Sequence, residues 1–234
     1  MNQPLKVFIG WDSREPEAYD VAKHSIERNA SIPVEVHALK QPDLRDAGLY
    51  SRPADPLAST EFTYTRFLTP HLAGKDGLAL FFDCDFLWLG DVADMLKLAT
   101  GDRALWCVQH NHVPTETTKM DGAVQTQYPR KNWSSLMLFN CAHPAVQALT
   151  PDVVNSQTPA YLHRMQWLKD EEIGGLPTEW NWLEGWNEKP ADGPPKVVHY
   201  TRGGPWFANW QHVDYGDLWL KEFEAVKAQQ AAEA

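Results

Sequence analysis

Residues 78–91 have the sequence LALFFDCDFLWLGD, in which a short apolar run leads directly into two carboxylates. The run at residues 78–82 predicts a buried strand, because a strand covered on both faces is apolar at every position. Extended backbone turns alternate side chains to opposite faces, so we expect Asp83 and Asp85 on one face and Cys84 on the other. Two carboxylates this close at the edge of an apolar core repel each other, and a proton or a cation must relieve the repulsion.

A divalent cation is the simplest partner for the acid pair. Oxygen ligands hold such an ion and leave coordination positions open for a phosphate. A plain turn or a solvated strand edge is the alternative, since acid pairs are common there. The preceding strand favours a ligand site, because α/β sheets bind ligands beyond the carboxyl ends of their strands.

The length of the chain, 234 residues, is enough to bury a substantial core. We expect one domain over residues 1–214, followed by a C-terminal helix over residues 215–234, and no internal repeat. No apolar run approaches the roughly 20 residues that a membrane span requires, and the N-terminus lacks a basic region followed by an apolar one. These features predict a cytoplasmic protein without a membrane span.

Charge and composition narrow the choice of partners. The net charge is −10 and no basic stripe is present, which argues against nucleic acid. An acidic protein still binds an anionic nucleotide where a metal ion and one or two arginines set the local potential. Cys84, Cys107 and Cys141 lie far apart in apolar sequence, which predicts reduced core thiols. Eleven tryptophans are the outlier; most must be core, although Trp also stacks well on sugars.

The segments before the acid pair predict the start of a parallel α/β sheet. Strands are expected at residues 5–10 and 33–39, with a helix between them that begins near Pro16. The ligand crevice then lies just beyond Ile9, and Asp12 faces it. Residues 41–61 have little periodicity and predict a long loop of the kind that forms lids.

A helix is expected to begin in residues 61–68 and to end near Gly74. Arg66 in this helix is interpreted as a surface charge, or as a phosphate clamp if the helix end faces the crevice. After the acids we expect a helix at residues 92–98, a strand at 104–108, irregular polar sequence at 109–131 and a buried strand at 135–139.

The last third of the chain predicts helices at residues 144–149 and 159–169, a turn region at 171–177, a strand at 196–200 and a helix from Tyr215 onward. His199 lies at the carboxyl end of its strand, as the acids lie at the end of theirs. A hydrogen-bonded core histidine is the alternative there. Gly203 and Gly204 follow, and they allow the backbone to approach a ligand closely.

Four segments in order resemble the GT-A glycosyltransferases, and more closely the glycogenin-like, retaining family-eight enzymes and their short bacterial relatives. They are VFIGWD at residues 7–12, YTRFL at 64–68, FDCD at 82–85 and HYTRGGPW at 199–206. The resemblance implies a single GT-A, Rossmann-like α/β domain with a mostly parallel mixed central sheet flanked by helices. It also implies Asp83, Asp85 and His199 as ligands of Mn²⁺, with Mg²⁺ as the alternative.

The same resemblance implies transfer of a sugar from a nucleoside-diphosphate donor, a UDP-sugar, to a carbohydrate or other hydroxyl acceptor, with retention of configuration. Front-face attack by the acceptor hydroxyl needs no dedicated protein base. The family's Asp-Gln pair has no clear counterpart, so Asp170 and Glu171 are only weak catalytic candidates. The nucleotide-sugar candidates are Ile9, Gly10, Trp11, Asp12, Tyr64, Arg66, Cys84, Arg202, Gly203 and Gly204. The candidates for sugar or acceptor contacts are Trp133, Ser134, Trp180, Asn181 and Trp206.

Three other functions are compatible with parts of the sequence. A haloacid-dehalogenase-type phosphatase also places Asp-x-Asp after an apolar strand, but its motif continues with Thr or Val where this chain has Leu87. A sugar-phosphate nucleotidyltransferase shares the sheet architecture, yet the Gly-rich basic loop after the first strand is missing. A non-catalytic carbohydrate-binding protein accounts for the tryptophans but not for the acid pair.

Overall fold

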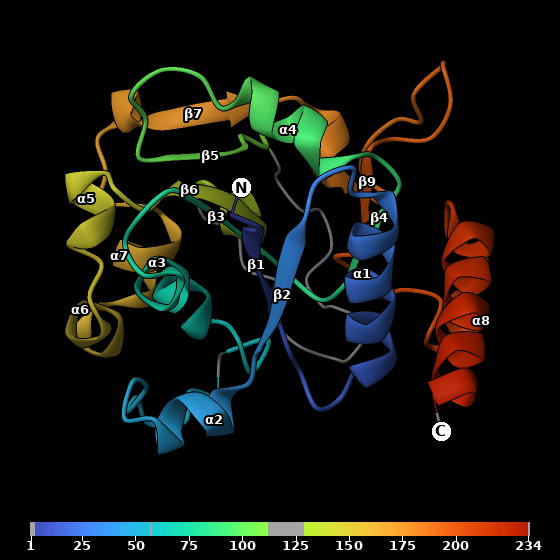
Figure 1. Cartoon of the computed structure of the whole chain (residues 1–234), viewed down its shortest axis with the longest axis horizontal. Helices are drawn as coiled ribbons and strands as arrows, with labels where there is room; N and C mark the ends of the chain where they lie inside the picture. The colour runs from blue at the N-terminus through green and yellow to red at the C-terminus, as the bar shows by residue number, and fades with distance from the viewer. Residues whose placement is uncertain (1–2, 57, 112–128, 234) are drawn as a thin grey trace.

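The computed structural model describes residues 3–56, 58–111 and 129–233, and a six-stranded mixed sheet lies at its centre (Figure 1). All neighbouring strands pair in parallel except β6, which runs antiparallel to both of its neighbours. This is the mostly parallel mixed sheet that the resemblance to GT-A glycosyltransferases implies. In spatial order the strands are β2 (Val34–Leu39), β1 (Leu5–Gly10), β3 (Leu78–Phe82), β6 (Leu136–Asn140), β5 (Leu105–Val108) and β7 (Ile173–Leu176).

A second, three-stranded sheet connects the acid pair to the end of the chain. Its order is β4 (Phe86–Trp88), β9 (Val197–His199) and β8 (Trp182–Leu183). Because β4 and β9 pair antiparallel, Phe86 lies opposite His199. The pairing continues past Phe86, where the Tyr200 amide donates a 2.9 Å hydrogen bond to the Asp85 carbonyl. Strand pairing thus brings His199 beside the acids.

Helices cover both sides of the main sheet (Figure 1). On one side lie α1 (Pro16–Asn29) and α8 (Gly216–Glu233), which Figure 1 shows next to each other. The Glu222 carboxylate of α8 joins them, accepting bonds from Arg28 at 2.9 Å and pairing with His24 at 2.7 Å. The other α-helices of the described residues are α2 (Gln41–Asp46), α3 (Thr69–Ala73), α4 (Val92–Leu98), α5 (Pro144–Gln147), α6 (Pro151–Ser156) and α7 (Pro159–His163). Within the described residues, none of the helices combines the length and the apolar character needed to cross a bilayer.

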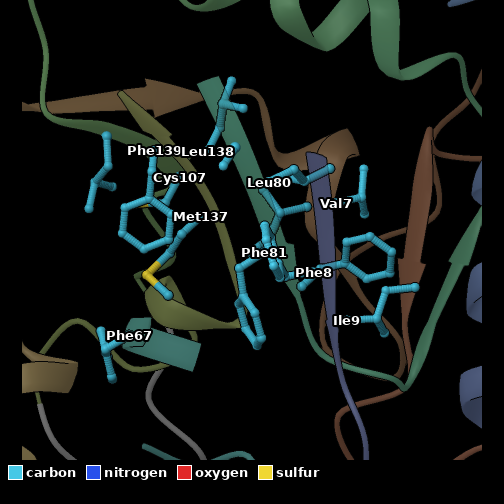
Figure 2. Close-up of a cluster of buried hydrophobic side chains, with 14 of the residues drawn as sticks. Val7, Phe8, Ile9, Phe67, Leu80, Phe81, Cys107, Met137, Leu138 and Phe139 are labelled. Carbon is cyan, nitrogen blue, oxygen red and sulfur yellow. The ribbon is translucent and has the colours of Figure 1, made fainter. Parts of the chain in front are cut away.

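The main core forms where side chains of the central strands meet those of the helices. Neighbouring strands contribute apolar residues at nearly every position, which is why β1, β3 and β6 are almost entirely buried. Figure 2 shows this packing around Val7, Phe8, Ile9, Phe67, Leu80, Phe81, Cys107, Met137, Leu138 and Phe139. The three cysteines are buried and free, as predicted, and burial raises the pKa of each thiol.

Two predicted segments differ in the structure, and a third falls largely outside the described residues. Residues 41–61 were expected to form one long loop, but α2 occupies the start of that segment. The helix expected over residues 159–169 ends at His163, and Met165 just beyond it has a positive φ of 50°. Of the irregular stretch predicted at residues 109–131, residues 112–128 lie outside the described residues.

The clearest miss is β7, a strand within the predicted turn region at residues 171–177. Glycine is common in turns, and this strand contains two glycines. In the structure Gly174 lies against Trp106 of β5, and a Cβ at this position would come within 2.1 Å of the indole. Glycine is therefore needed for close packing between neighbouring strands here, and not for a turn.

Candidate metal and donor site

The acids lie at the carboxyl edge of the main sheet, directly after β3. The Asp83 amide donates to the Ser135 carbonyl at 3.0 Å, which extends the β3–β6 ladder by one residue. Cys84 is buried while its two neighbours are partly exposed, in agreement with the predicted alternation. His199 arrives from β9, and its Nε2 lies 3.4 Å from Oδ1 of Asp85.

One ligand atom from each of Asp83, Asp85 and His199 lies within 4.8 Å of the other two. The side chains of the acids are 14% and 20% exposed and that of the histidine 3%. Two carboxylates held this close in a partly dry setting repel each other, and a cation between them removes the repulsion. Two carboxylate oxygens and one imidazole nitrogen form a donor set that suits Mn²⁺ and also accepts Mg²⁺. The residues therefore fit a divalent cation.

Arg66 is an internal counter-ion of the first acid. Its Nη1 lies 2.8 Å from Oδ1 of Asp83 and donates to the Ser134 carbonyl, also at 2.8 Å. The residue is only 6% exposed, and its guanidinium lies over the rings of Phe62 and Phe81. The interpretation of Arg66 as a surface charge is therefore wrong, because it lies in the short 3₁₀ turn Thr65–Leu68 that packs against the sheet.

The Asp12 carboxylate, just beyond the end of β1, connects this strand to Glu61 in the segment before the 3₁₀ turn. It accepts two bonds from the Arg14 guanidinium, at 2.9 and 2.7 Å, and one from the Glu61 amide at 3.1 Å. Burial acts to raise the pKa of Asp12, but the hydrogen bonds from Arg14 and Glu61 outweigh it and leave the pKa below its ordinary value. At 1% exposure Asp12 does not itself face a crevice, in contrast to the prediction.

An open pocket of about 220 Å³ lies beside this junction. Arg14 and Glu61 line it together with Tyr64, one of the predicted donor contacts. The Tyr64 hydroxyl donates to Asp55, and the Arg52 guanidinium lies 4.1 Å from the centre of the tyrosine ring. The pocket therefore presents both cationic and anionic groups close to the carboxyl end of β1.

The other predicted donor contacts near β1 and β3 differ in accessibility. Trp11 is partly exposed, and the Lys40 ammonium lies 5.0 Å from its ring centre. Gly10 packs under Phe62, where a Cβ would approach the ring to 2.4 Å. Ile9 and Cys84 are buried, so only their backbone groups could contact a ligand in this arrangement.

Arg202 lies in the turn after β9 and is engaged by a carboxylate. Its Nη2 donates to Glu184 at 3.0 Å, and the guanidinium lies 5.3 Å from the ring centre of Trp210. Gly203 has a φ of 117°, which favours glycine, and a Cβ on Gly204 would meet the Trp206 ring at 2.1 Å. The glycines thus shape this turn, and a direct contact of Arg202 with a phosphate remains a prediction.

The predicted sugar or acceptor contacts separate by burial. Trp180 and Asn181 are 1% and 0% exposed, so neither presents a surface to a sugar in this structure. Trp206 packs against Trp219 of α8, with ring centres 5.5 Å apart. Ser134 is buried beside His163, 2.9 Å from its Nδ1. Trp133 is partly exposed, and its indole donates to the His110 carbonyl at 2.9 Å.

The weak catalytic candidates lie elsewhere. Asp170 and Glu171 precede β7, whose first residue is level with Leu105 at the start of β5. The acid pair follows the opposite, carboxyl end of the parallel strands. Asp170 pairs with Arg130, and the Glu171 carbonyl accepts from Arg103. The structure therefore does not bring these two acids to the candidate metal site.

Three site residues were not singled out from the sequence. Ser135 and His163 support the residues around Asp83 and His199, and Glu184 holds Arg202. Ser135 stood in the segment Asn132-Trp133-Ser134-Ser135, but nothing in the sequence alone distinguishes it from its neighbour. Such side chains become recognisable only when their distant partners are placed in space.

Solved glycosyltransferases share the fold. The bifunctional glycosyltransferase WbbM superposes with a TM-score of 0.67 at 16% identity, covering 95% of this chain and 50% of its own. GlyE of Streptococcus pneumoniae TIGR4 gives 0.64 at 14%, covering 99% and 64%. The galactosyltransferase LgtC, solved in complex with donor and acceptor sugar analogs, gives 0.59 at 14%, covering 94% and 96%. The chain thus spans half of the WbbM chain and just under two thirds of GlyE, and at these identities the likeness concerns the fold.

A much closer sequence relative exists in a plant. Protein CDI of Arabidopsis thaliana is 54% identical over 235 residues, which cover 99% of this chain and 91% of that protein. No protein-family model matches the sequence.

Proposed function

The chain belongs to the family of Arabidopsis thaliana protein CDI, and because it has the fold of GT-A-like glycosyltransferases, we propose that it transfers a sugar from a nucleoside-diphosphate donor to a hydroxyl acceptor. A fold alone hosts many activities, so the proposal depends on the site. One observation carries it: Asp83, Asp85 and His199 converge at the carboxyl edge of the sheet. That edge is where open α/β sheets bind their ligands.

Asp83, Asp85 and His199 are the residues that would hold the metal ion. When bound there, a divalent ion supplies Lewis-acid stabilisation of the charge that develops on a leaving diphosphate. Arg66 fixes the direction of the Asp83 carboxylate through its 2.8 Å contact and its bond to the Ser134 carbonyl. Asp12 anchors the Glu61 amide to the end of β1, which shapes one wall of the pocket beside it.

The finer assignments within this proposal are Mn²⁺ as the ion, a UDP-sugar as the donor, retention of configuration, and membership of the glycogenin-like group. The mixed carboxylate and imidazole donor set favours Mn²⁺. Front-face attack by the acceptor hydroxyl needs no protein base, so it is compatible with the location of Asp170 and Glu171 before β7, away from the acid pair. The acceptor is a hydroxyl group of a carbohydrate or another molecule.

Thermal unfolding with nucleotides tests the proposal. UDP, GDP and ADP are titrated separately, each with and without Mn²⁺. A ligand at about 100 times its Kd adds about 2.7 kcal/mol of stability. For a chain of this size that amounts to a Tm increase of about 5–10 °C. We expect this increase with UDP and Mn²⁺ together, followed by Mn²⁺-dependent release of UDP from a UDP-sugar.

The other outcomes of this titration distinguish the remaining functions. A larger increase in Tm with GDP or ADP than with UDP would indicate that the donor carries that nucleotide instead of UDP. Stabilisation by free sugars without any nucleotide would indicate a carbohydrate-binding protein. A nucleotide response that does not depend on metal, or none at all, would contradict the proposed transferase.

A further inference from the structure

A chain of buried hydrogen bonds leads from the backbone before β6 to the imidazole of the candidate metal site. Ser135 Oγ lies 2.6 Å from the Asn132 carbonyl oxygen, and Asn181 Nδ2 lies 2.9 Å from Ser135 Oγ. Asn181 Oδ1 lies 2.8 Å from Nδ1 of His199. We call Ser135 and Asn181 the relay. Both are buried, at 4% and 0% exposure, so water does not compete for these bonds.

The donor and acceptor of each hydrogen bond follow from the bond between Ser135 and the Asn132 carbonyl. A carbonyl oxygen only accepts, so the Ser135 hydroxyl must donate its one hydrogen to Asn132. Ser135 Oγ can then only accept from its other neighbour, which requires the Asn181 amide nitrogen on that side. The amide oxygen is thereby turned toward His199. Because that oxygen only accepts, Nδ1 of His199 carries the hydrogen.

The plane of the imidazole is fixed independently of the relay. His199 stacks on Phe86, with ring centres 4.3 Å apart and planes inclined by 27°. Backbone pairing of these two residues across β4 and β9 holds the rings together. Stacking leaves one freedom, a flip of the ring, and the bond to Asn181 removes it. Nε2 therefore lies toward Asp85, at 3.4 Å from Oδ1.

We propose that Asn181, oriented by Ser135, is a positioning residue that keeps a hydrogen on Nδ1 of His199 and directs Nε2 at the gap between His199 and the acids. The hydrogen on Nδ1 follows from the relay alone, and its consequence for metal binding rests on the proposed function. Hydrogen-bond partners behind a metal-binding histidine commonly contribute 10–100-fold to metal affinity. This role replaces the sugar contact that the sequence suggested for Asn181.

The first test is the tautomer of His199 in metal-free protein. Long-range ¹H–¹⁵N correlation spectra in alkaline buffer separate a protonated ring nitrogen from one with a lone pair, and His199→Gln assigns the signal. We expect the hydrogen on Nδ1 in the wild type. Asn181→Asp keeps the accepting oxygen and should keep this tautomer. Asn181→Leu removes the acceptor at similar volume and should give a mixture of tautomers.

The second test is Mn²⁺ affinity measured by calorimetry on the same proteins. Asn181→Leu should weaken Mn²⁺ binding about 10–100-fold. Ser135→Ala leaves Asn181 in place without its orienting partner, so a smaller loss is expected. Asn140→Leu is the matched control. The Asn140 side-chain amide also donates a hydrogen bond to a backbone carbonyl, that of Arg103, but Asn140 lies at the far end of β6. Its affinity should equal that of the wild type.

The possible results separate the relay from the metal site. An Nε2–H tautomer in the wild type would overturn the relay. So would wild-type affinity in both Asn181→Leu and Ser135→Ala. If Asn181→Leu does not fold, Ser135→Ala decides alone. An Nδ1–H tautomer in wild-type protein that binds no Mn²⁺ would confirm the relay and contradict the proposed metal-dependent function.

Discussion

Replacing Arg66 with methionine should destabilise the fold strongly. Met fills most of the space of the side chain but removes the guanidinium that lies 2.8 Å from Asp83. The bonds to the Ser134 and Thr63 carbonyls, at 2.8 and 3.2 Å, are lost as well. Breaking a buried ion pair by removing one partner typically costs about 3–5 kcal/mol. At about 2–4 °C per kcal/mol for a chain of this size, the Tm should fall by roughly 6–20 °C.

A double-mutant cycle identifies the cause of this loss. Asp83→Asn removes the negative charge, and Arg66→Met with Asp83→Asn removes both charges together. Because the double variant leaves no buried charge without its partner, it should be more stable than the sum of the single losses predicts, by at least about 1 kcal/mol. The free energies of unfolding come from urea titration in metal-free buffer. Losses that add to within about 0.5 kcal/mol would refute the coupling of Arg66 and Asp83.

Three further perturbations have distinct expected results. Asp85→Ala should abolish the Mn²⁺-dependent thermal shift while the circular dichroism spectrum stays unchanged; a retained shift would contradict the metal assignment. Burial, with a smaller contribution from the charge of Arg66, lowers the pKa of His163 from 6.5 to about 3. Its contribution to the free energy of unfolding is therefore complete above pH 6.5 and decreases as the pH is lowered, by roughly 1–2 kcal/mol near pH 5. His163→Gln should flatten this part of the stability profile measured by urea titration. Gly10→Ala forces a Cβ to within 2.4 Å of a ring and should cost about 1–3 kcal/mol. Gly175→Ala, with its nearest neighbour at 3.9 Å, should cost under about 0.5 kcal/mol; equal losses would contradict the packing argument.

The sequence predicts best where periodicity and burial agree. The apolar run at residues 78–82 is β3, and the strand–helix–strand pattern at the N-terminus is β1, α1 and β2. The meeting of His199 with the acids was predicted from a resemblance spread over the chain, and the structure brings the three side chains together. Strand ends are good places for such predictions, because parallel strands end at a common edge.

Local sequence fails where a distant partner decides the outcome. Gly174 and Gly175 suggest a turn, yet this segment pairs with β5 as a strand. The Trp106 ring of β5 occupies the space that a side chain at position 174 would need. Arg66 resembles a surface charge until Asp83 is placed beside it. Asn181 is a sequence candidate for sugar or acceptor contacts, but in the structure its side chain bonds to Ser135 and His199. In each case the partner lies far away in sequence and no local pattern reveals it.

Anomalous diffraction from crystals grown with Mn²⁺ and UDP tests the metal site most directly. Data collected near the manganese absorption edge locate the ion without reference to any assumed ligand. We predict a single strong anomalous peak within bonding distance of Asp83, Asp85 and Nε2 of His199, and of an oxygen of the diphosphate. A peak elsewhere, or none at these three side chains while UDP is bound, would contradict the proposal that they hold the ion on which sugar transfer depends.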